Sequence, residues 1–188
     1  MTISFKNIFT NIVIISMMAM FFSCGNDAQE VRDFLADKNL PIGVAENFHN
    51  IHTDSGRVDL KISAPLLHDY KNRKKHPYTE FPKGIKVVTI DKNKDSVVVT
   101  GNYAITYSKT SISEIKDKVV VVNHADYKKL LTEQLFWDQK TKYFYTEKPF
   151  TLITKTDTIY GIGFDASEDL KVFMAKQNRG SIYLKEDN

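Results

Sequence analysis

The sequence predicts an all-β domain built from repeated hairpins, preceded by a secretion signal and a short polar tether. Three observations support this. From about Val44 onward, short runs rich in Val, Ile, Thr, Tyr and Phe alternate with charged or Asn/Gly/Asp turns. No stretch after Pro41 shows the periodicity of a long helix. A short pattern recurs four times along the chain, which indicates stacked, similar units.

The N-terminus has the organisation of a secretory signal. Lys6 precedes an apolar run that ends at Phe22, and the small residue Ser23 stands directly before Cys24. Ser23-Cys24 resembles a lipobox, although the bulky Phe21 and Phe22 depart from its strictest form. We therefore expect residues 1–23 to be a lipoprotein signal peptide and Cys24, the only cysteine, to carry palmitate. The alternative is an uncleaved membrane helix, but the run is shorter than the roughly 20 residues that a span needs.

Residues 24–43 are expected to be a polar tether. Val31, Phe34 and Leu35 have the spacing of a short amphipathic helix, and Pro41 would end it. Residues 44–188 then form the β-domain. The expected strands are Val58–Ala64, Ile85–Ile90, Val97–Tyr107, Lys118–His124, Lys128–Trp137, Lys142–Thr146, Phe150–Thr154, Thr158–Phe164, Lys171–Ala175 and Ser181–Leu184.

The recurring pattern lies inside these strands. Its four copies are Ile62–Leu66, Val99–Tyr103, Leu131–Leu135 and Tyr160–Phe164. A polar turn and another strand follow three of the copies, so each unit is a hairpin that cannot bury its apolar face alone. Stacked hairpins would make one long curved sheet.

Strict alternation of side chains along each strand assigns one face to the interior. The residues expected on this face include Leu66, Tyr103, Ile105, Leu135, Trp137, Ile162 and Phe164. Leu131 and Glu133 fall on the same face, and the charged Glu133 is an anomaly there.

Several segments together resemble the LptC family. They include Leu130–Asp138, Tyr143–Thr146 and Phe150–Ile153, then Tyr160–Phe164, with Asp54–Arg57, Ala64-Pro65 and Tyr78–Gly84 upstream. The resemblance covers about Leu40 to Leu184. Each motif is weak alone, but their order and spacing together are fairly specific.

The resemblance implies a twisted, partly open β-jelly roll that holds the acyl chains of lipopolysaccharide. It implies a periplasmic protein that accepts this lipid from an inner-membrane ABC transporter and passes it to a bridge protein of similar fold. The interior face above would then be the lipid groove. Better-known members have an N-terminal transmembrane helix, whereas Cys24 would supply a lipid anchor here, with the inner membrane favoured.

Two further sites are expected. The cationic segment Lys71, Arg73, Lys74 and Lys75 supplies candidate contacts to lipid phosphates. The alternative interpretation is a solvated connecting loop. Ser181, Ile182, Tyr183 and Leu184 would follow a turn at Asn178-Arg179-Gly180 and form the edge strand that meets the bridge protein.

Other functions find little support. The net charge of +3 is too mild to indicate a nucleic-acid partner. No nucleophile motif is present, so we expect neither an enzyme nor a cofactor. His49 and His52 lack further ligands for a metal site, and Asp91–Asp95 imitates a calcium loop but reads better as a hairpin turn. The alternatives left open are a carrier of another lipid or of lipoproteins, and a structural or carbohydrate-binding β-sandwich lipoprotein.

Overall fold

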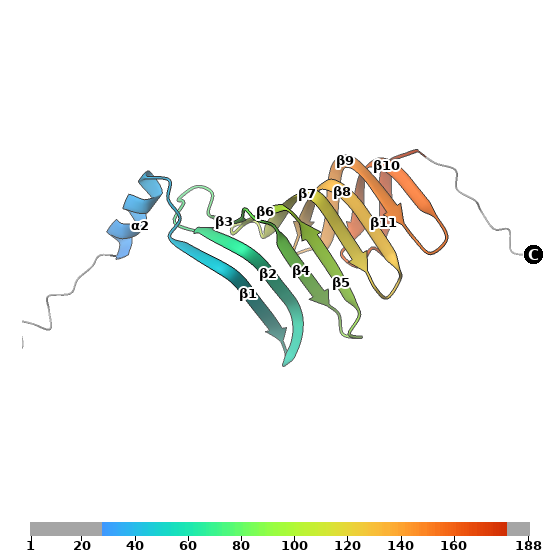
Figure 1. Cartoon of the computed structure of the whole chain (residues 1–188), viewed down its shortest axis with the longest axis horizontal. Helices are drawn as coiled ribbons and strands as arrows, with labels where there is room; N and C mark the ends of the chain where they lie inside the picture. Colours follow the sequence, from blue (N-terminus) through green and yellow to red (C-terminus); the bar gives the residue numbers. More distant parts are fainter. Residues whose placement is uncertain (1–27, 180–188) are drawn as a thin grey trace, which may run out of the picture. The chain divides into compact units, whose positions relative to one another are not determined.

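A computed structural model describes residues 28–179, the last two by their backbone alone (Figure 1). Contacts divide the chain inside its described helix, α2 (Ala28–Asp37), and the described residues from Leu35 onward form one β-domain with the last turn of this helix. The strands are β1 (Gly43–Asp54), β2 (Arg57–Tyr70), β3 (Tyr78–Phe81), β4 (Ile85–Ile90), β5 (Ser96–Gly101), β6 (Tyr103–Tyr107), β7 (Ile112–Asn123), β8 (Lys128–Asp138), β9 (Tyr143–Ile153), β10 (Thr158–Ser167) and β11 (Phe173–Arg179). The predicted all-β fold is confirmed, because no described residue after Asp37 is helical.

All eleven strands belong to one antiparallel sheet. β2 pairs with β4 through Leu60–Ser63 and with β3 through His68–Tyr70. β7 likewise pairs with β5 through its second half and with β6 through its first half. β3 and β4 therefore act as two halves of one long strand, and so do β5 and β6. Continuing this order, the sheet is a row of long strands that are each interrupted near the middle.

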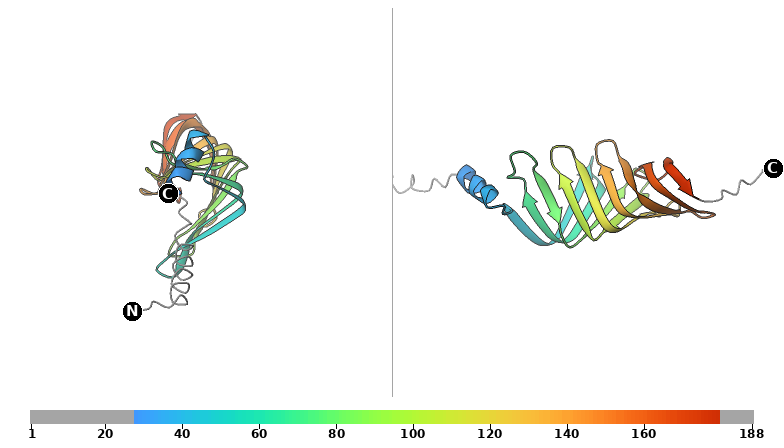
Figure 2. Two further views of the ribbon diagram at one scale, coloured as in Figure 1. Left: turned by 90° about the vertical axis from the view of Figure 1, so that its left-hand side faces the viewer. Right: turned by 90° about the horizontal axis from the view of Figure 1, so that it is seen from above.

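The interruptions line up across the sheet and form a corner. β1 has a positive φ at Asn47, opposite Pro65 of β2. Gly84 (φ 91°) separates β3 from β4, and Asn102 separates β5 from β6. The corner continues at Asp117 and Lys118 of β7, at the register shift between Thr132 and Phe136 of β8, at Glu147 and Lys148 of β9, and at Gly163 of β10. The left view of Figure 2 shows the sheet folded back on itself.

The corner divides the β-domain into two layers. We call arm A the layer that ends in the hairpin turns at 55–56, 91–95, 124–127 and 154–157. Arm B ends in the turns at 71–77, 108–111, 139–142 and 168–172. Because the corner interrupts the ladder, side chains satisfy backbone groups there. The Thr132 hydroxyl donates to the Pro149 carbonyl (2.9 Å), and the Thr146 hydroxyl accepts from the Lys148 N–H (3.1 Å). Both threonines are buried, which explains two polar residues in an apolar interior.

The core lies between the arms, and near β9 to β11 it consists of aromatic rings in contact with one another. Phe164 is fully buried and contacts Phe150 edge-on (ring centroids 5.3 Å apart) and Phe173 in a stacked arrangement (5.1 Å). Each such side chain contributes about 1.5–3 kcal/mol by leaving water. At this end of the domain the interior is therefore filled by the protein itself.

The corner shifts the alternation of side chains, and several face predictions were wrong for this reason. In β8, Leu130 and Thr132 are buried before the shift and Leu135 and Trp137 after it, so Leu131 is not in the core and Glu133 is exposed. The predicted inward positions that fail are Leu66, Tyr103, Ile105 and Ile162. Their neighbours take the interior places instead, as Leu67, Ala104 and Gly161 show.

The strand predictions also need corrections. β1 and β3 were missed, because β1 carries only exposed and half-buried residues and β3 is four residues long. Val97–Tyr107 is two strands instead of one, whereas Lys142–Thr146 and Phe150–Thr154 are parts of one strand, β9. The predicted strand Lys118–His124 is the second half of β7, which begins at Ile112. Asn178 and Arg179 end β11 and pair with Gly161 and Tyr160, so they are not the predicted turn.

Gly101 should be intolerant of any side chain, because a Cβ there would overlap the Ile115 Cγ2 methyl and lie 3.1 Å from the Lys116 carbonyl oxygen. We expect Gly101→Ala to lower the free energy of unfolding by about 1–3 kcal/mol, as overpacking does. Gly43→Ala is the control, since its Cβ would make an ordinary 3.8 Å contact. Urea unfolding of both variants checks this. Equal urea midpoints for Gly101→Ala and Gly43→Ala would contradict the steric constraint at Gly101 in the corner.

Candidate functional site

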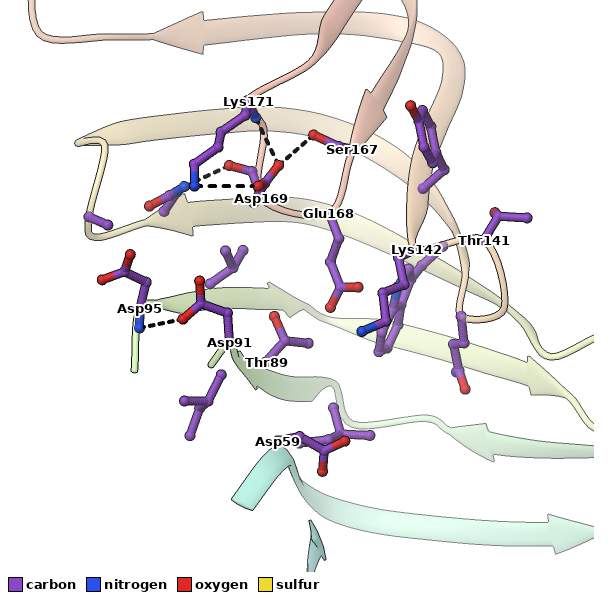
Figure 3. A pocket seen from close by; sticks show the side chains of 18 of the residues that line it. Asp59, Thr89, Asp91, Asp95, Thr141, Lys142, Ser167, Glu168, Asp169 and Lys171 are labelled. Atoms are coloured by element: carbon purple, nitrogen blue, oxygen red, sulfur yellow. Dashed lines mark hydrogen bonds and ion pairs between the residues drawn. The ribbon is translucent and has the colours of Figure 1, made fainter. Parts of the chain in front are cut away.

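A cavity of about 650 Å³ opens between the ends of the two arms (Figure 3). Arm A contributes the ends of β2, β4 and β5, and arm B contributes the turns 139–142 and 168–172. This volume lies in the range of ligand pockets. The apolar part of its lining comes mainly from Leu60, Ile90, Val97 and Trp137.

Arm A lines the cavity with carboxyl groups held by local hydrogen bonds. His52 donates to Asp59 (2.7 Å), and this hydrogen bond lowers the pKa of Asp59. The Asp91 carboxylate accepts from the backbone N–H groups of Asn93 (2.8 Å) and Asp95 (2.9 Å), which shapes the β4–β5 turn. Asp91 and Asp95 are thereby held at the rim of the cavity (Figure 3).

Arm B closes one side of the cavity with the turn between β10 and β11. Leu170 has a positive φ (57°) and is fully buried in the core. The Asn123 side chain donates to the Asp169 carbonyl (2.6 Å), and the Lys128 ammonium donates to the Leu170 carbonyl (2.8 Å). Since Asn123 and Lys128 belong to arm A, these contacts tie the two arms together.

Glu168 occupies the middle of this wall. Its backbone N–H donates to the Lys142 carbonyl (2.9 Å), and its side chain points into the cavity (Figure 3). Burial raises the pKa of the Glu168 carboxyl, against the opposing effects of a hydrogen bond with Thr89 and of the charge of Lys142. A carboxyl group with a raised pKa in a cavity is typical of functional sites, although ion-pair networks also produce it.

Trp137 and Val97 belong both to the lining of the cavity and to the core, and Trp137 is the larger of the two. Its ring packs against Phe144 (centroids 6.2 Å apart), and its indole Nε1 is buried with no hydrogen-bond acceptor among the described residues. A buried donor without an acceptor is costly, typically about 1–3 kcal/mol.

The structure separates the predicted groove residues into two groups. Leu135, Trp137 and Phe164 lie in the core, and of these only Trp137 lines the cavity. Leu66, Tyr103, Ile105 and Ile162 lie outside the core; the Tyr103 hydroxyl, for example, donates to Glu80 (2.7 Å). The open part of the interior is thus nearer the ends of the arms than the alternation of the sequence predicted.

The predicted cationic segment forms the β2–β3 turn at the end of arm B. Arg73 is partly buried, donates to the Ala36 carbonyl and lies over the Tyr70 ring (5.1 Å), so its guanidinium serves the fold. Lys71 forms an ion pair with Asp69 (3.7 Å). Lys74 and Lys75 belong to the same turn. The end of arm B therefore carries Lys71, Lys74 and Lys75 as a cationic rim, to which Arg73 does not contribute.

Cys24 and Ser181–Leu184 lie outside the described residues. The described residues contain no helix long and apolar enough to cross a membrane. Within residues 28–179, no cluster of His, Cys, Asp and Glu is arranged to hold a metal ion.

Sequence reasoning missed Leu170, Asn123 and Glu168. Leu170 is a single apolar residue in a charged turn, Glu168-Asp169-Leu170-Lys171, and this isolation was the one available signal. Asn123 resembles any turn residue in the sequence, because its partner is 46 positions away.

An antiparallel sheet folded over an open, partly apolar cavity defines the class of small β-proteins that bind a ligand between their layers. A family model for LptC-related lipopolysaccharide-assembly proteins matches residues 12–183, so the chain belongs to this family, whose members serve lipopolysaccharide transport in the cell envelope. No curated protein matches the chain.

Glu168 should make stability depend on pH in a defined direction. Because its pKa is raised above the ordinary value of 4.5, the folded chain keeps a proton that the unfolded chain loses. The free energy of unfolding should therefore fall as pH rises through the window above 4.5, and Glu168→Gln should remove this loss. Urea titrations between about pH 4 and pH 7 should show the variant gaining stability over the wild-type chain as pH rises. If the free energies of unfolding of the variant and the wild-type chain differ by the same amount at every pH, the burial of this carboxyl is contradicted.

Proposed function

We propose that the chain accepts lipopolysaccharide from an inner-membrane ABC transporter into the cavity between arms A and B and passes it to a periplasmic bridge protein of similar fold. The cavity carries this proposal, because it is open at the ends of the arms and shares Val97 and Trp137 with the apolar core. Trp137 belongs to both, so acyl chains entering beside Leu60 and Val97 would extend toward the core.

The hydrophobic effect is strong enough to draw lipid into such a cavity. Each methylene removed from water contributes about 0.8 kcal/mol, so a dozen would contribute about 10 kcal/mol before ordering costs. Burial has no direction, however. Net movement must come from ATP hydrolysis by the transporter and from capture by the next protein.

The sheet has an edge at each end for contacts with such partners. Among the described strands, β1 pairs only with β2, and β11 pairs only with β10. Unpaired backbone groups at a sheet edge favour strand addition by a partner. We propose that the bridge protein docks at the C-terminal edge, on the segment Ser181–Leu184 that follows β11.

The proposal also includes the lipid anchor at Cys24 and the lysines at the end of arm B. Palmitate on Cys24 would hold the chain at the inner membrane beside the transporter. Lys71, Lys74 and Lys75 would contact lipid phosphates at the rim of arm B, where a flexible ammonium can reach a phosphate group.

Photo-crosslinking in cells tests this function. A photoreactive amino acid replacing Leu60, which lines the cavity, should crosslink to lipopolysaccharide when the transporter is active. The same residue in place of Lys61, its exposed neighbour on β2, is the matched control and should not crosslink. In place of Ile182, it should crosslink to the bridge protein.

Equal lipid crosslinking at positions 60 and 61 would indicate adhesion to a membrane instead of binding in the cavity. Absence of lipid at both positions, in a chain that folds, would overturn the transport proposal. A lipid crosslink at position 60 without a bridge crosslink at position 182 would overturn only the docking edge.

A further inference from the structure

We infer that the turn between β10 and β11 is a strap that opens to admit lipid: its buried Leu170 fills the place of an acyl chain in the lipid-free domain and leaves when that chain enters. The strap is defined as residues 168–172. This inference rests on the proposed function, since it specifies how the interior takes up the apolar part of the lipid. It depends on the burial of Leu170, on its backbone conformation, and on the contacts that hold the strap to arm A.

The strap carries an aliphatic side chain into the interior from the end of arm B. Leu170 is fully buried and belongs to the core. The turns 108–111 and 139–142, which also end arm B, contain no buried residue. A leucine side chain and a lipid acyl chain are both built of saturated carbon, so one can take the place of the other without bringing water into the interior.

The backbone at Leu170 is strained. Its φ of 57° lies in the left-handed region, which bulky side chains rarely adopt. Among the described residues other than glycine that have a positive φ, Leu170 alone is buried. Such a conformation persists only where its surroundings hold it, and it is frequent in ligand clamps and switch regions. Opening of the strap would therefore relieve strain at the same time as it exposes Leu170.

Arm A holds the strap through the backbone carbonyl groups of the strap. The Asn123 side chain donates to the Asp169 carbonyl (2.6 Å), and the Lys128 ammonium donates to the Leu170 carbonyl (2.8 Å). Asn123 is itself fixed by Asp126, whose backbone N–H donates to the Asn123 side-chain oxygen (3.0 Å). Both carbonyl groups of the strap are uncharged, and water can hydrogen-bond to them once the strap opens. These two contacts can therefore break without separating an ion pair.

The strap keeps its own hydrogen bonds when it leaves arm A. The Asp169 carboxylate accepts from the Lys171 backbone N–H (3.0 Å) and forms an ion pair with the Lys171 ammonium (3.7 Å), so both partners lie within the strap. The Glu168 N–H donates to the Lys142 carbonyl, which belongs to the adjacent turn of arm B. Figure 3 shows Glu168 and Asp169 across the cavity from Asp59 of arm A. The strap can thus move together with arm B, away from arm A.

Replacement of Leu170 by an acyl chain keeps the interior filled in both states. An empty apolar space in a core is costly, because the atoms around it lose contacts. Leu170 fills this space in the lipid-free domain, and the acyl chain fills it in the complex. The closed strap then competes with lipid, so the measured affinity is reduced to the extent that the strap is closed. A variant with a weaker strap should bind lipid more tightly.

Binding of purified lipopolysaccharide to two variants and their controls tests the inference. Leu170→Ala shortens the side chain that competes with lipid. Lys128→Met removes the ammonium that donates to the Leu170 carbonyl but keeps an apolar stem of similar length. Ile115→Ala is the control for the first variant, because Ile115 is a fully buried side chain of the same size beside Gly101 in the corner. Lys129→Met is the control for the second, because Lys129 is the exposed neighbour of Lys128 on β8.

We expect Leu170→Ala and Lys128→Met each to bind about tenfold more tightly than the wild-type chain, a factor that corresponds to about 1.4 kcal/mol. Both controls should bind no more tightly than the wild-type chain. Trp137 is the only tryptophan in the chain and lines the cavity, so its emission reports binding to the full chain in amphipol. Urea unfolding of each variant shows whether it folds. If Leu170→Ala does not fold, the two lysine variants decide the result.

The outcomes separate this inference from the proposed function. Wild-type affinity in Lys128→Met, or in a folded Leu170→Ala, would overturn the strap and leave transport standing. A gain in Ile115→Ala or Lys129→Met equal to that of its partner variant would show that the change is not specific to the strap, and would also overturn the inference. Failure of every chain, including the wild-type chain, to bind lipopolysaccharide would count against the proposed function itself.

Discussion

The corner that crosses the sheet is the constraint on which the rest of the structure depends. A strand that bends sharply loses ladder hydrogen bonds, and buried backbone groups must then find other partners. Here Thr132 and Thr146 supply those partners, and Gly101 and Gly161 leave room where a Cβ would collide with the next strand. Since every long strand bends at the same level, one sheet forms both layers of the domain, and no second sheet is needed to cover its apolar face.

The cavity follows from this arrangement because two arms joined at a corner are closest together there and farthest apart at their ends. Near β9 to β11 the space between the arms is filled by Phe150, Phe164 and Phe173 and by the buried Leu170. Asn123 and Lys128 fasten the Leu170 turn across the gap. Charged turns gather at the open ends, so a lipid would meet polar groups at the mouth and apolar groups farther in.

The sequence predicted the strands and the family but not the corner as such. The recurring pattern at Val99–Tyr103, Leu131–Leu135 and Tyr160–Phe164 marks the corner, yet strict alternation treated each copy as a straight strand. Each bulge shifts the alternation by one position, which explains why Ile162 was placed inward although its neighbour Gly161 is the buried residue. The anomaly of Glu133 was the available sign, since this residue stands at the bulge and is exposed. The turn that contains Leu170 closes one side of the cavity through contacts between segments far apart in the sequence, and no local sequence pattern predicts such contacts.

Because Leu135 and Phe164 are fully buried, a lipid with several acyl chains can enter the interior only if the arms move apart. The distance between spin labels at Lys94→Cys on arm A and Lys140→Cys on arm B, two exposed turn residues, tests this claim most directly. Measured on the full chain by pulsed electron spin resonance, the distance should lengthen when lipopolysaccharide is added. An unchanged distance at saturating lipid would contradict binding between the arms.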